Sequence, residues 1–125
     1  MGAPVQTFRM SLGSRYSVAV CLWEESASAP VRHKFAFEGY FDPLCKHSAK
    51  IGTIHLGRDY LSYGTITHEA YHAIVELERR IRPVETRRGV RWSDDDKEEW
   101  CAQRIEALAT GIAKRLAKNG ESISL

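Results

Sequence analysis

The chain has 125 residues, of which 43% are hydrophobic, and this length and composition are ordinary for one compact globular domain, which we expect to span residues 1–125. The formal net charge is only +2, so no overall positive field favours binding to nucleic acid. No apolar run approaches the roughly 18 residues of a membrane span and no signal peptide is recognisable, so we expect no membrane contact and a cytoplasmic location. The three cysteines, Cys21, Cys45 and Cys101, are widely spaced, which favours free thiols over a disulfide framework.

The first half of the chain, residues 1–58, is predicted to be rich in β-structure. Four segments with alternating, β-branched or aromatic residues predict strands: residues 7–11, 15–23, 33–41 and 50–56. Gly13-Ser14 fits a hairpin turn between the first two of them, and residues 24–30 are expected to form a loop. We therefore predict a small, mostly antiparallel sheet.

The second half, residues 59–125, is predicted to be helical. Apolar residues recur at helical spacing over residues 62–81, and Pro83 is expected to stop that helix. Residues 82–92 then form an arginine-rich connector.

A second helix is predicted after this connector. Ser93-Asp94-Asp95-Asp96 is an S-x-x-D start signal that places acidic residues in the first turn, and the helix is expected to run to about Lys118. The predicted fold class is therefore α+β, with the sheet packed against the two helices.

The sequence His68-Glu69-Ala70-Tyr71-His72 is an H-E-x-x-H motif inside the first predicted helix. One helical turn separates the two histidines, so both imidazoles point to one side and can hold one zinc ion. Glu69 lies about 100° around the helix from His68, where it can reach an activated water rather than the metal. This is the layout of a zinc hydrolase.

A catalytic zinc usually has three protein ligands, and the second helix offers Glu98 and Glu99. Glu98 lies three residues before Cys101 and seven before Ile105, so helical phase predicts that it projects with the buried face, and Glu99 lies at the margin of that face. A carboxylate on an apolar face is costly unless a charge meets it, which a zinc ion would do. We predict Glu98 as the third ligand, with Glu99 as the alternative.

With these residues in place, the chain resembles a small gluzincin-type zinc metallopeptidase, one of the minimal zincins found in phages and mobile elements. The resemblance covers roughly residues 50–112 and is carried by Gly52-Thr53-Ile54-His55-Leu56, by the H-E-x-x-H motif and by Lys97-Glu98-Glu99-Trp100-Cys101.

The resemblance implies a zincin-like domain in which a short edge strand borders the substrate cleft and a later helix returns with a ligand glutamate. It implies His68, His72 and Glu98 as zinc ligands and Glu69 as the general base for hydrolysis of a peptide or protein by metal-activated water. The strand at residues 51–56 is then the edge that would pair with an extended peptide.

Several alternatives stay open. Tyr63, Tyr71 and His55 are candidates for stabilising an oxyanion, although for His55 we favour plain surface exposure. Cys45 and His47 are a weak second pair of metal ligands. The arginine-rich stretch either contacts phosphates or an acidic partner or is a solvated connector; its members are Arg79, Arg80, Arg82, Arg87, Arg88 and Arg91. The chain is either a peptidase, a hydrolase of another amide such as one in the cell wall, or a non-catalytic zinc-binding interaction protein. The sequence does not determine the oligomeric state.

Overall fold

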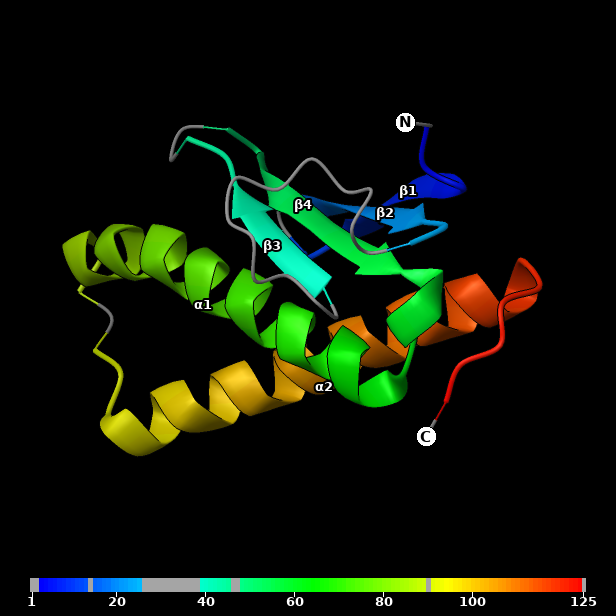
Figure 1. Ribbon diagram of the computed structural model, residues 1–125. Helices are drawn as coiled ribbons and strands as arrows, with labels where there is room; N and C mark the ends of the chain where they lie inside the picture. Colours follow the sequence, from blue (N-terminus) through cyan, green and yellow to red (C-terminus); the bar gives the residue numbers. More distant parts are fainter. Residues whose placement is uncertain (1–2, 14, 26–38, 46–47, 90, 125) are drawn as a thin grey trace.

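The computed structural model describes residues 3–13, 15–25, 39–45, 48–89 and 91–124. These residues form four strands, one short 3-10 helix and two long helices: β1 (Gln6–Ser11), β2 (Ser17–Trp23), β3 (Gly39–Pro43), β4 (Lys50–Gly57), η2 (Arg58–Tyr60), α1 (Tyr63–Arg87) and α2 (Asp94–Lys118). Both helices lie on the same face of the sheet (Figure 1). The α+β fold predicted from the sequence is therefore confirmed.

The sheet is mixed, with the strand order β1-β2-β4-β3. β1 and β2 pair antiparallel, as do β3 and β4. β4 lies between β2 and β3 and runs parallel to β2. The expectation that residues 51–56 form the edge strand is wrong, since β4 has a neighbour on each side. The edge strand beside α1 is β3. Residues 33–38 of the predicted strand 33–41 lie outside the described residues.

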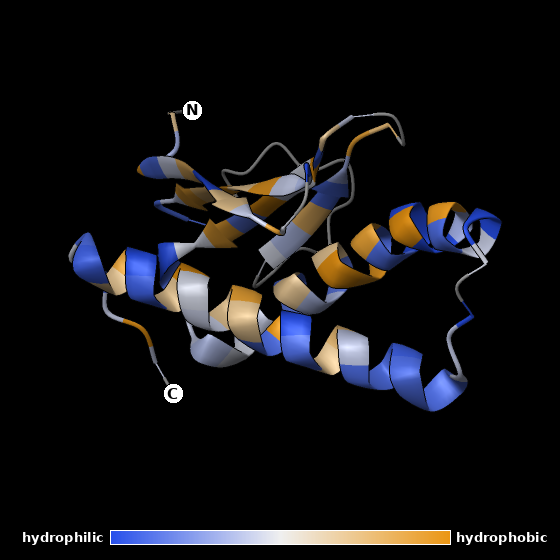
Figure 2. Cartoon of the chain, turned by 180° about the vertical axis from the view of Figure 1, so that it is seen from behind, coloured by the Kyte–Doolittle hydropathy of each residue, from blue (hydrophilic) through white to orange (hydrophobic). Residues whose placement is uncertain are grey.

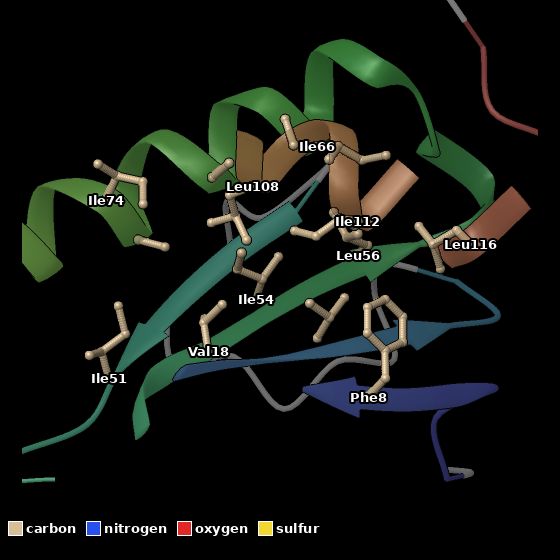
Figure 3. Close-up of a cluster of buried hydrophobic side chains, with 14 of the residues drawn as sticks. Phe8, Val18, Ile51, Ile54, Leu56, Ile66, Ile74, Leu108, Ile112 and Leu116 are labelled. Carbon is tan, nitrogen blue, oxygen red and sulfur yellow. The ribbon is translucent and has the colours of Figure 1, made fainter. Parts of the chain in front are cut away.

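The core lies between the sheet and the two helices (Figure 3). Alternate residues of β2 and β4, including Val18 and Ile54, point to this face and are fully buried. Ile66 of α1 and Ile112 of α2 meet them from the helix layer. Each such side chain contributes about 1.5–3 kcal/mol by leaving water, so this face fixes which side of each helix is turned inward.

α1 begins where the sequence predicts but runs further than expected. The Ser62 side chain caps the helix by accepting a hydrogen bond from the backbone N–H of Thr65 at 3.0 Å. The helix continues through Pro83 to Arg87, so the predicted stop at Pro83 is wrong. Pro83 is exposed near the C-terminal end of the helix, where the hydrogen bond lost to a proline is less costly than in a buried interior.

α2 also begins as predicted. Ser93 and Asp96 form a capping box, in which each side chain accepts a hydrogen bond from the other residue's backbone N–H. The buried residues of α2, all of which are described, come only from its C-terminal half, starting at Leu108. The preceding turns carry mostly hydrophilic residues (Figure 2). Glu98 is exposed, so the prediction that it projects with the buried face is wrong, because that face becomes fully buried only from Leu108 onward.

Two further expectations concern the cysteines and membrane-spanning helices. Cys21, Cys45 and Cys101 are free thiols, as predicted. No helix in the described part of the chain is long and apolar enough to cross a membrane.

Candidate metal centre

The two histidines of the H-E-x-x-H motif lie together on the exposed side of α1. The Nε2 atoms of His68 and His72 are 3.2 Å apart, and the two rings meet edge to face at 79°. Both residues are exposed to solvent. Helical spacing thus brings two imidazole nitrogens close enough to share one partner.

This separation fits a tetrahedral zinc site. Two imidazole nitrogens that each lie 2.0–2.1 Å from a zinc ion, at the tetrahedral angle, are about 3.3–3.4 Å apart. The observed 3.2 Å between the Nε2 atoms differs from this by about 0.1–0.2 Å. The separation of the two nitrogens is therefore compatible with one shared ion, and the same 3.2 Å is also the length of a hydrogen bond between the two rings.

The electrostatics of the pair also favour metal binding. Partial burial, and then the neighbouring imidazole of His68, lower the pKa of His72 below its ordinary value of 6.5. The form that binds a metal is the neutral imidazole. His72 is therefore in its binding form at neutral pH.

Glu69 is held against the edge strand. It is only 4% exposed, and a Cβ atom added at Gly39 of β3 would lie 3.0 Å from its Cγ and 3.2 Å from its Oε2. A residue other than glycine at position 39 would therefore require the Glu69 side chain or the β3 backbone to shift. The carboxylate thus lies between the helix and β3, one position along the chain from His68.

A cavity of about 410 Å³ opens beside these residues. One wall is β3 and the other is the exposed flank of α1; its lining residues are Gly39, Tyr40, Phe41, Pro43, His68, Glu69, His72, Val75, Glu76 and Arg79. The site is thus a cleft between the motif helix and an edge strand, and His68, Glu69 and His72 all line it.

The structure does not bring Glu98 or Glu99 to the histidine pair. α2 packs on the flank of α1 that carries Tyr63, whose hydroxyl lies 3.1 Å from Oγ1 of Thr110. Five residues at 100° each place His68 about 140° around α1 from Tyr63. Among the described residues, no group of three or more histidine, cysteine, aspartate or glutamate side chains is arranged to hold a metal ion. Glu98 as the third ligand stays a prediction from the sequence.

The other sequence candidates lie in different places. The Tyr63 hydroxyl points to α2 and away from the cleft. Tyr71 is half exposed with its ring 5.5 Å from that of His72. His55 is buried, and its Nδ1 accepts a hydrogen bond from the indole N–H of Trp23 at 3.0 Å. Burial lowers the pKa of His55, which is not a cleft residue.

The thiol candidates give no second centre. Cys45 is exposed, and His47, its predicted partner, lies outside the described residues. Burial, and then the nearby carboxylate of Glu78, raise the pKa of the Cys101 thiol, which disfavours the thiolate that a metal or a nucleophilic role needs.

Sequence reasoning missed the residues that β3 contributes to the cleft. Gly39 and Tyr40 lie at the end of the segment predicted as a strand, but nothing local shows that this strand is the edge next to α1. Arg80, which fastens α1 to the β3–β4 connection, was assigned only to the arginine-rich stretch.

The chain matches no protein-family model, no curated protein and no solved structure, so the interpretation of this centre rests on its own residues.

Proposed function

We propose that the chain is a zinc-dependent metallopeptidase-like hydrolase that cleaves a peptide or protein. The observation that carries the proposal is the 3.2 Å separation of the His68 and His72 Nε2 atoms in a cleft that also contains Glu69. When bound there, zinc would supply Lewis-acid polarisation of a carbonyl and activation of water. A purely structural metal site has no need of a carboxylate beside its ligands.

The residues of the chain would act as follows. His68 and His72 hold the ion through Nε2. Glu69 removes a proton from the attacking water and delivers it to the leaving amine. Since Glu69 is nearly inaccessible to solvent and lies against Gly39, its carboxylate is fixed in place before the substrate arrives.

The edge strand gives the substrate a place to bind. Within the described residues, β3 pairs only with β4, so its outer edge offers backbone N–H and C=O groups beside the cleft. An extended peptide can add to this edge as a further strand, with affinity that comes mostly from the main chain. The three free cysteines support a reducing compartment, and we propose a cytoplasmic location.

Metal content tests the site first. Mass spectrometry of the purified protein is expected to find about one zinc per chain, and His72→Ala is expected to lose it. Glu98→Gln, measured beside it, tests the predicted third ligand: loss of zinc would support Glu98, and retention would exclude it. Absence of metal from the wild-type protein after zinc is supplied would remove the proposal.

Cleavage of a peptide library tests the chemistry. The wild-type protein with zinc is expected to cleave peptides, and Glu69→Gln is expected to keep zinc and lose about 10²–10⁴-fold in rate, the usual contribution of a general base. Full hydrolysis by a zinc-loaded Glu69→Gln variant would contradict the assigned role.

One observation favours a second candidate, a non-catalytic zinc-binding interaction protein. Glu69, the general base of the first candidate, is only 4% exposed, which limits the access of a substrate to its carboxylate. Zinc binding without cleavage of any library peptide, in both the wild-type protein and Glu69→Gln, would favour this alternative.

A further inference from the structure

A second cavity, of about 510 Å³, lies further along α1 toward its C-terminal end. It is lined by six residues of α1 and by the two described residues just before β2: Glu76, Arg79, Arg80, Pro83, Val84, Arg87, Arg15 and Tyr16. Glu76 and Arg79 line this cavity and the first one as well. The two cavities therefore adjoin, and a chain bound in the cleft can continue into the second cavity.

The second cavity is basic, but one of its four arginines is already used. Arg80 is buried and donates hydrogen bonds to Glu76 and to the carbonyl oxygens of Leu44 and Ser48. Glu76, the one acidic residue among the described lining residues, is thus paired with Arg80 at 3.1 Å. These two charges largely cancel, so neither is available to a ligand.

The other three arginines keep donors for a ligand. The side chain of Arg79 is 69% exposed and reaches Glu76 only at 3.9 Å. Among the described residues, neither Arg15 nor Arg87 forms an ion pair, and Arg15 lies over the ring of Tyr16 at 5.1 Å from its centre. We call Arg15, Arg79 and Arg87 the basic groove. It is a site for anions, because each guanidinium presents a planar fork of N–H donors.

The helix sets the spacing between the basic groove and the histidine pair. Arg79 follows His72 by seven residues, which is about 10.5 Å along α1 and nearly the same direction around it. Arg87 follows by fifteen residues, or about 22.5 Å. Since an extended peptide advances about 3.3 Å per residue, these distances correspond to about three and seven residues.

We propose that the basic groove binds an acidic segment of the peptide that occupies the cleft, with aspartate or glutamate side chains about three to seven residues from the histidine pair. Carboxylates suit the three guanidinium forks, and Tyr16, Pro83 and Val84 give the groove apolar walls for the stems of peptide side chains. The small formal net charge of +2 favours a short acidic peptide over a polyanionic backbone. The claim that this peptide is a substrate rests on the proposed function, whereas the claim that it binds to the basic groove is independent of that function.

Fluorescence anisotropy with the full chain tests the binding. The probe is a labelled peptide of about 16 residues with a central block of aspartate and glutamate, long enough to span both cavities, and its counterpart has asparagine and glutamine instead. The acidic peptide is expected to bind at least about tenfold more tightly than the neutral one. Equal binding of the two peptides would overturn the proposal.

Matched variants locate the binding. The double variant Arg79→Gln, Arg87→Gln is expected to abolish the preference for the acidic peptide. The double variant Arg9→Gln, Arg91→Gln lowers the formal net charge equally, from +2 to 0, at exposed residues outside the cavity, and is expected to keep the preference. An equal loss of this preference in both double variants would show a general charge effect and overturn the proposal. Tighter binding of single-stranded DNA than of the acidic peptide, lost in the first variant, would instead assign the groove to nucleic acid.

The failure of this proposal is distinguishable from failure of the proposed function. Binding of the acidic peptide by metal-free protein, without cleavage when zinc is added, would leave the groove standing and remove the hydrolase. Cleavage of library peptides with no preference for acidic residues at these distances would leave the hydrolase standing and remove the groove.

Discussion

Arg80 is predicted to be the side chain on which the stability of the cleft depends most. Its side chain is only 3% exposed, and it joins α1 to the connection between β3 and β4. The guanidinium donates to the carbonyl oxygens of Leu44 at 2.7 Å and Ser48 at 2.8 Å and pairs with Glu76 at 3.1 Å. Replacing it by methionine keeps most of the side-chain volume and removes every one of these bonds.

The expected loss in the free energy of unfolding comes from the buried groups that Arg80→Met leaves without a partner. Removing one partner of a buried ion pair costs about 3–5 kcal/mol. Glu76 is 20% exposed and regains some water, which puts Arg80→Met near the lower end, at about 3–4 kcal/mol. The contact of Arg80 with the carbonyl of Ile51, at 3.4 Å, is long for a hydrogen bond and adds little. For a domain of this size, the loss lowers Tm by roughly 10–15 °C.

Thermal and urea unfolding, followed by circular dichroism, measure the effect, and Arg79→Met is the matched control. Arg79 is the adjacent arginine, its side chain is 69% exposed, and its nearest carboxylate oxygen is 3.9 Å away, so its loss is expected to cost less than about 0.5 kcal/mol. Arg80→Lys keeps the charge but not the fork and is expected to fall between the two. If Arg80→Met and Arg79→Met lay within about 1 kcal/mol of each other, the reasoning from buried donors would be refuted.

Two further predictions concern pH and the cleft. Burial lowers the pKa of His55 below its ordinary value of 6.5, so below that pH the unfolded state binds more protons than the folded state and the stability of the protein is expected to decrease. The Tm of metal-free His55→Gln should therefore depend less on pH than that of the metal-free wild-type protein. Parallel curves of Tm against pH for the two proteins would contradict this. Gly39→Ala adds a Cβ that would lie 3.0 Å from Cγ of Glu69 and 3.1 Å from the backbone carbonyl oxygen of His55, so it is expected to displace Glu69 and slow peptide cleavage by about tenfold or more at unchanged zinc content. In Gly64→Ala the added Cβ meets only the Ser62 hydroxyl at 3.8 Å, so this variant should keep the rate, and equal rates in both variants would refute the steric argument.

The features that the sequence predicted correctly depend on neighbours along the chain. The face shared by His68 and His72 follows from the helical repeat alone, and their 3.2 Å contact agrees with it. The start of α2 depends on Ser93 and Asp96, which are three residues apart and cap each other. The positions of β1, β2 and β4 likewise reflect local alternation, whereas among the described residues β3 overlaps the predicted strand 33–41 only at residues 39–41 and continues to Pro43.

The features that were wrong depend on partners far along the chain. Residues 51–56 have the pattern of a strand, but whether a strand is central or at an edge depends on where β2 and β3 pair, which alternation does not specify. Glu98 follows the apolar phase of α2, yet it is exposed, while Cys101 and Ile105 on the same face are only partly buried against the core. Pro83 breaks helices when its surroundings cannot compensate, and here it faces solvent.

The division of α1 into three flanks explains both the cleft and the distance of the histidine pair from α2. One flank packs on the sheet through residues such as Ile66, the second contacts α2 through Tyr63, and the third carries the histidine pair and continues to Arg79 and the basic groove. Because the helix itself separates the second flank from the third, a ligand from α2 would have to pass around α1 to reach the pair. A Glu98→Gln variant that keeps its zinc would agree with this geometry, whereas loss of zinc would show that the glutamate of α2 reaches the pair.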